Sequence, residues 1–147
     1  MSDSSRGILG LILICIWVVV AAASLGAQMP GGSAAAKAMK NPVPATAASV
    51  KAGEALFQKN CVFCHGPHGL GDGKLAPPGV HPANLTDDKW VRGNTDGEIR
   101  AVIINGAGPE FKMKGVGTRL SDTDIWNLVN YVRSLSLSAK NATKNAN

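Results

Sequence analysis

The apolar residues of this 147-residue chain are concentrated near its N-terminus, where residues 7–27 carry no charged side chain. As a helix rising about 1.5 Å per residue, this segment would reach roughly 31 Å, close to the hydrocarbon thickness of a bilayer. We therefore expect a transmembrane anchor at 7–27, preceded by a polar N-terminus at 1–6. A cleaved signal peptide is the alternative, because the small residues at 21–23 would suit a signal peptidase.

The segment that follows, residues 28–48, has the composition of a linker. It contains three Pro, two Gly and many Ala, and it shows no apolar periodicity. The alternative is a partly helical tether formed through the alanines, which would have a shorter reach than a coil.

Three later segments have the apolar spacing of short amphipathic helices. The first covers 49–60, and the second begins at Thr95, with Glu98 at the spacing of a capping box. The third begins at Ser121, and its apolar stripe follows the spacing i, i+3, i+4, i+7, i+10: Ile125, Leu128, Val129, Val132 and Leu135.

The remaining stretches contain no element of regular length. Gly and Pro exclude long helices from 66–82 and 106–117, and no run alternates as a strand does. Residues 138–147 are polar, and we expect a disordered tail there. The sequence therefore predicts a small all-α domain at 49–137.

Composition and charge limit the partners of this domain. The formal net charge is +5, and the excess lies outside the predicted anchor. The chain has neither a basic helix nor Arg interleaved with aromatic residues, so a nucleic-acid partner is not expected, and an acidic protein surface is favoured. Only 5% of the residues are aromatic, which predicts a thin core that a large bound apolar group would help to fill.

The chemistry is carried by the motif Cys61-x-x-Cys64-His65. Two thiols three residues apart at the end of a helix can each add to a haem vinyl group, and the imidazole next to the second thiol can bind the iron. A redox disulfide would require a strand-to-helix frame, and a zinc site would require further ligands at short spacing. The only other cysteine, Cys15, lies in the apolar segment, so the motif predicts one covalent haem c.

The sixth iron ligand is expected to be Met113. It is the only Met downstream of the haem motif, and it lies between glycine-rich segments with charged neighbours, unlike a core residue. His68 and His81 are the rival ligands. His68 is only three residues past His65, and His81 is more simply explained by a local hydrogen bond.

From about residue 50 to 135 the chain resembles a class I cytochrome c of the bacterial single-haem type. Gly53 and Phe57, the haem motif followed by Gly66, then Met113, and finally Leu128 and Tyr131 match the pattern of that family in order and spacing. The resemblance implies that Gly53 lets the first helix cross the last one closely and that Phe57 packs there.

The resemblance also implies several roles for residues around the haem. The His65 ring would donate its free N–H to a backbone carbonyl, that of Pro77 or a neighbour in the same loop. Trp90 and Arg92 are candidates to bind the haem propionates.

Imidazole and thioether ligands together leave no open iron position, which favours single-electron transfer over catalysis. The alternative is a haem enzyme or gas sensor in which Met113 dissociates. We expect a bacterial inner-membrane protein with its haem domain on the periplasmic side, working within or beside an oxidase, a quinol-oxidising complex or a photosynthetic reaction centre. Basic residues near Met113, namely Lys112, Lys114 and Arg119, would steer the domain onto an acidic surface.

Overall fold

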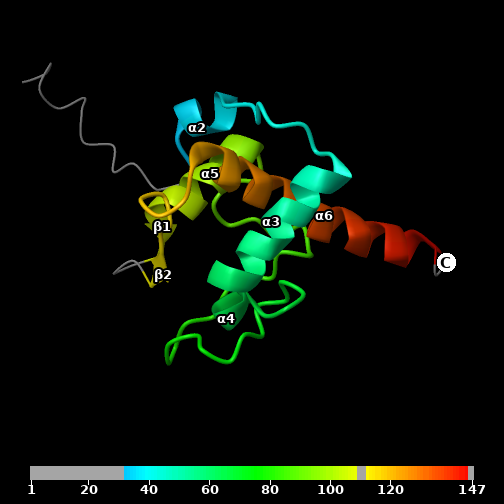
Figure 1. The fold of residues 1–147 in the computed structure, drawn as a ribbon. Helices are drawn as coiled ribbons and strands as arrows, with labels where there is room; N and C mark the ends of the chain where they lie inside the picture. Colours follow the sequence, from blue (N-terminus) through cyan, green and yellow to red (C-terminus); the bar gives the residue numbers. More distant parts are fainter. Residues whose placement is uncertain (1–31, 109–111, 146–147) are drawn as a thin grey trace, which may run out of the picture.

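The computed structural model describes residues 32–108 and 112–145. The chain forms a mostly helical domain in which α3 (Ala47–Asn60) crosses α6 (Asp122–Asn145), with α5 (Asp96–Asn105) packed beside α6 (Figure 1). The short helices are α2 (Ala34–Ala38) and α4 (Val62–His65). No helix in these two ranges is both long and apolar enough to span a membrane, and the anchor predicted at 7–27 lies outside them.

The all-α prediction is correct for the main elements and wrong in one detail. Strand β1 (Gly106–Ala107) pairs antiparallel with β2 (Met113–Lys114), and Ala107 lies opposite Met113. Two-residue strands are too short to show the alternation by which a strand is recognised in a sequence.

The crossing of α3 and α6 depends on Gly53. A Cβ atom at this position would lie 2.0 Å from the Asn127 carbonyl oxygen and 2.8 Å from Tyr131 Cβ. The backbones therefore approach more closely than any side chain would allow, as the resemblance implied. Phe57, one turn further along α3, is 1% exposed, and its ring centroid is 5.2 Å from that of Tyr131.

The core lies where these three helices meet. The predicted stripe of α6 faces inward, with Leu135 packed at the edge of the cluster. The buried cluster consists of Phe57, Ile99, Ile103, Val116, Ile125, Trp126, Leu128, Val129, Tyr131 and Val132. The helix starts also agree with the sequence: Thr95 and Glu98 form the predicted capping box, and Ser121 Oγ accepts from the Asp124 backbone N–H at 3.1 Å.

Residues 33–46, which the sequence analysis assigned to the linker, are packed on the domain as a strap. Helix α2 rests on Gly97 of α5, where an added Cβ would lie 2.0 Å from the Ala36 carbonyl oxygen. Asn41 then donates to the Asn130 side chain at 2.8 Å, and the Asn130 amide donates to the Val43 carbonyl at 3.1 Å. The alternative of a partly helical tether describes this segment better than a free linker does.

The C-terminal end also differs from the prediction. Helix α6 runs to Asn145, so residues 138–145 are helical where a disordered tail was expected (Figure 1). Most of the side chains described in this extension are exposed. The apolar stripe ends at Leu135, and the helix continues beyond it with residues that are not part of the core cluster, including an exposed Leu137.

Candidate haem-binding site

The haem motif lies at the junction of two helices that turn around Cys61. Cys61 ends α3 and begins α4, and its backbone N–H donates to the Phe57 carbonyl at 2.8 Å. One short turn later, the His65 N–H donates to the Cys61 carbonyl at 2.9 Å. Gly66 then ends α4 with φ at 77°, a left-handed conformation that favours glycine. The motif is thereby presented at the end of the helix that crosses the core.

The two cysteines are free thiols with partly exposed side chains. The pKa of Cys61 is raised to about 11, mainly by burial and also by the neighbouring Cys64, while the Arg119 guanidinium opposes the shift. Cys61 is therefore a neutral thiol at physiological pH.

The imidazole of His65 is buried, with 8% of the residue exposed. Its Nδ1 lies 3.1 Å from the Ala83 carbonyl oxygen, and burial lowers the pKa of the ring while this hydrogen bond opposes the shift. The prediction of a backbone carbonyl as the acceptor is correct, but the acceptor is Ala83 and not Pro77, whose carbonyl accepts from the Val80 N–H at 2.9 Å. An occupied Nδ1 fixes the tautomer and leaves Nε2 as the nitrogen that can bind a metal.

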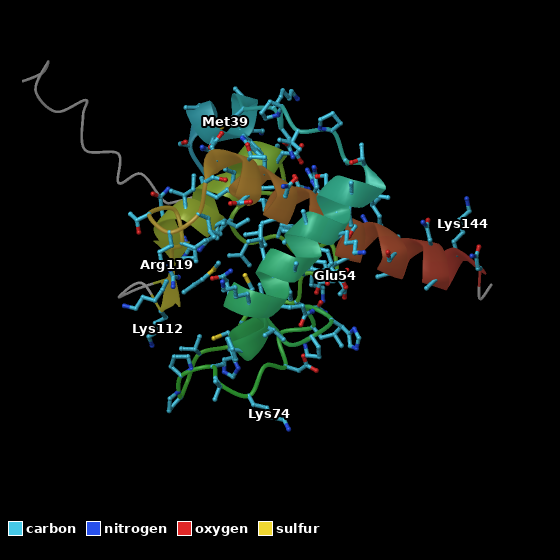
Figure 2. The ribbon with its side chains drawn as sticks, viewed as in Figure 1. Met39, Glu54, Lys74, Lys112, Arg119 and Lys144 are labelled. Atoms are coloured by element: carbon cyan, nitrogen blue, oxygen red, sulfur yellow. The ribbon has the colours of Figure 1, made fainter. Side chains whose placement is uncertain are left out.

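The loop between the motif and Ala83 folds tightly back on α4. Gly73 donates its N–H to the Cys64 carbonyl at 3.1 Å, and Leu75 donates to the Phe63 carbonyl at 2.9 Å. A Cβ at Gly73 would lie 2.4 Å from the Cys64 carbonyl carbon, so only glycine fits. The end of the haem motif is thus held by backbone hydrogen bonds from the loop on which Lys74 lies (Figure 2).

The other predicted site residues lie in separate parts of the domain. Met113 opens β2 and is half-buried. Trp90 is half-buried against the core cluster, and Arg92 is half-buried in the loop before α5. His68 and His81, the rival ligands, are both exposed. The roles of Met113, Trp90 and Arg92 remain predictions.

Sequence reasoning missed the segment that holds the His65 ring. Ala83 acts through its backbone carbonyl, so its side chain gives no signal. The neighbouring Asn84 and Thr86 did offer a signal. An Asn side chain that can accept from the backbone N–H two residues later is typical of a turn.

The chemistry of these donors fits a covalently bound haem. Two free thiols one turn apart can form thioether bonds, and a neutral imidazole with a fixed orientation can bind iron. Among the residues that the structure describes, no group of three or more His, Cys, Asp or Glu side chains is arranged to hold a metal ion directly.

Comparison with known proteins gives concordant matches. The family model for cytochrome c oxidase, cbb3-type, subunit III matches residues 48–132. The chain is 38% identical over 97 residues to the cbb3-type cytochrome c oxidase subunit FixP of Azorhizobium caulinodans, covering 62% of this chain and 31% of that protein. It is 34% identical over 97 residues to the subunit CcoP of Rhodobacter capsulatus, covering 63% and 31%.

Among solved structures, a chain of the Kuenenia stuttgartiensis reducing HAO-like protein complex Kustc0457/Kustc0458 is similar, with a TM-score of 0.59 and 28% identity. The match covers 64% of this chain and 46% of that chain. The chain spans about a third of the length of the two oxidase subunits. Because the family model covers more than half of the sequence, including the haem motif, α5, nearly all of α3 and the first half of α6, the chain belongs to the family of cbb3-type cytochrome c oxidase subunit III.

Proposed function

We propose that this chain is a membrane-anchored cytochrome c with one haem, which passes single electrons within a cbb3-type oxidase. The observation that carries the proposal is the buried imidazole of His65, held by the Ala83 carbonyl immediately after the cysteine pair. A ring fixed in this way is prepared to bind iron through Nε2 before the metal arrives.

The residues of the chain then have distinct roles. Cys61 and Cys64 would bind the haem covalently, and His65 and Met113 would bind its iron. When bound, the haem iron supplies a one-electron redox couple. A thioether opposite the imidazole would leave no open position for substrate, which favours electron transfer over a gas-sensing or catalytic role.

Family membership supports an oxidase as the partner, since the relatives are named as oxidase subunits. Neither a quinol-oxidising complex nor a photosynthetic reaction centre receives comparable support. Placement of the haem domain on the periplasmic side of the bacterial inner membrane follows from the proposed anchor at 7–27 and from haem attachment outside the cytoplasm. Protease added to spheroplasts should then release a soluble haem fragment cut within 28–48.

The experiment is expression of the full chain in a bacterium that matures c-type cytochromes. We expect a mass increase of one haem that survives acid–acetone extraction, and loss of the haem during extraction would refute covalent attachment. In the oxidised protein, a weak near-infrared sulfur-to-iron band should disappear in Met113→Ala. Met39→Leu, a change at an exposed thioether on the strap, should retain the band.

Two further measurements separate the alternatives. If the band is absent from the unmodified protein and His81→Ala changes the spectrum, His81 is the sixth ligand instead of Met113. If carbon monoxide binds the reduced protein at neutral pH, the thioether dissociates and the gas-sensing role is favoured. Co-purification with oxidase subunits in mild detergent tests the partner.

A further inference from the structure

The loop at 82–86 is built to present one carbonyl group. The Ala83 carbonyl accepts from His65 Nδ1, and two residues later the Leu85 N–H donates to the Gly69 carbonyl at 2.7 Å. Successive peptide groups of this loop therefore contact both the ring of His65 and the backbone beyond it. The direction of the Ala83 carbonyl depends on how firmly this turn is held.

Asn84 closes the turn with its side chain. Its Oδ1 accepts from the Thr86 backbone N–H at 2.9 Å and from the Thr86 hydroxyl at 2.8 Å. An Asn side chain that bonds the backbone two residues further on imitates a backbone turn and fixes the peptide groups between. The turn fixes the Asn84–Leu85 peptide, whose N–H donates to Gly69, and the peptide that carries the Ala83 carbonyl is joined directly to it at the Cα atom of Asn84.

The backbone at 69–71, which contacts both His65 and the loop at 82–86, is rigid for a different reason. Gly71 donates its N–H to the His65 carbonyl at 2.9 Å, and a Cβ on Gly71 would lie 2.4 Å from the Pro82 carbonyl oxygen. Gly69 and Gly71 both have left-handed φ angles, 72° and 82°. The loop at 82–86 therefore lies directly against the backbone that follows His65, and the hydrogen bonds of Asn84 to Thr86 hold the loop from within.

We propose that Asn84 is a positioning residue for the His65 ligand. The inference rests on the proposed haem site. A fixed Ala83 carbonyl keeps the hydrogen bond to Nδ1–H short, which makes the imidazole a stronger donor to iron and favours the oxidised state. Loss of the Asn84 turn loosens the carbonyl, weakens the donor and raises the reduction potential.

The test uses the full chain with its haem and compares Asn84→Ala, Asn84→Asp and Thr86→Val with the unmodified protein. Asn84→Ala removes both bonds of the turn, whereas Thr86→Val removes only the bond from the hydroxyl. Asn84→Asp keeps an oxygen acceptor in the same place. Asn105→Ala is the control, because Asn105 is an exposed side chain that donates to the Ala101 carbonyl of its own helix at 2.9 Å.

Two quantities are measured: the reduction potential, and the exchange rate of the His65 ring N–H in the reduced protein by NMR. In Asn84→Ala the ring N–H should exchange about tenfold faster, the factor expected for the loss of one to two net hydrogen bonds. Its potential should rise, and Thr86→Val should show smaller changes in the same directions. Asn84→Asp should restore slow exchange, and Asn105→Ala should change neither quantity.

The proposal is overturned if Asn84→Ala carries haem but keeps the exchange rate and the potential of the unmodified protein. A fall in melting temperature alone, matching that of Asn105→Ala, would make Asn84 a purely structural residue. If Asn84→Ala fails to mature, Thr86→Val decides between these outcomes by the same two measurements. Absence of covalent haem from the unmodified protein would instead refute the proposed function.

Discussion

Replacing Gly53 by Ala tests whether the contact between α3 and α6 holds the domain together. The new methyl carbon would lie 2.0 Å from the Asn127 carbonyl oxygen and 2.8 Å from Tyr131 Cβ. Ordinary contact between such atoms begins near 3.4 Å. The helices must therefore separate by more than about 1 Å, because the first obstacle is backbone and cannot rotate away.

The size of the effect follows from two opposing contributions. Overpacking a well-packed contact costs about 1–3 kcal/mol, and a clash with backbone belongs at the upper end. Ala favours a helix over Gly by about 1 kcal/mol, which offsets part of this cost. We expect the free energy of unfolding to fall by about 2 kcal/mol, a loss of roughly 8–16 °C in melting temperature for a domain of this size.

Thermal and denaturant unfolding of the holoprotein, followed by circular dichroism, measures this change. Ala55→Gly is the matched control, since Ala55 is exposed on α3 and reports the helix preference alone. That variant should lose about 1 kcal/mol. A Gly53→Ala protein that is as stable as the unmodified protein, or more stable, would refute the account of the crossing.

Three other variants test other parts of the structure. Hydrogen bonds from the backbone and side chain of Thr95 lower the pKa of Glu98 from its usual 4.5. The stability that the Glu98 carboxylate contributes should therefore be complete above pH 4.5 and lost as the pH falls through the lowered pKa. Glu98→Gln should therefore be less stable at pH 7 by about 1 kcal/mol and should lose less stability than the unmodified protein on titration to pH 3. Asn130→Ala removes the hydrogen bonds to Asn41 and Ser49, which keep only the Trp126 carbonyl and the Asn127 side chain as partners, so it should cost about 1–3 kcal/mol. It should also expose 33–46 to limited proteolysis, and unchanged protease resistance would contradict the role of the strap. Reversing Lys112 and Lys114 to Glu should slow electron transfer to the partner and flatten the dependence of its rate on salt between 0.01 and 0.15 M, where screening shortens from about 30 to about 8 Å. Lys144→Glu, at the far end of α6 (Figure 2), is the control and should leave the rate unchanged.

The parts of the fold that were predictable depend on local chemistry or on a regular period. Thr95 and Glu98 are three residues apart, so their reciprocal bonds need nothing from the rest of the chain. The stripe of α6 repeats at helical spacing and reaches the core as predicted. Cys61, Cys64 and His65 lie within five residues of one another, so their arrangement is local too.

The parts that were missed depend on contacts between distant residues. Ala83 lies 18 residues from His65 and contributes only a carbonyl group, which every residue possesses. Pro77 was the less suitable choice because its carbonyl accepts from the Val80 N–H at 2.9 Å within its own turn. The sequence predicts a linker for the strap because its Ala and Pro residues show no apolar periodicity. Its packing depends instead on Gly97 and Asn130, which lie far along the chain.

For the membrane-anchored haem domain proposed above, the strap limits how far the domain could move from the membrane. A free linker of 21 residues at 28–48 could extend to about 65 Å. Because 33–46 is packed on α5 and α6, the chain between the proposed anchor and the domain is residues 28–32, which cannot exceed about 18 Å even when fully extended. A domain restricted in this way could exchange electrons only with a partner whose acceptor lies within that distance of its own anchor. Packing of the strap is therefore consistent with the proposed role as a subunit beside an oxidase, in which the partner is held next to the anchor.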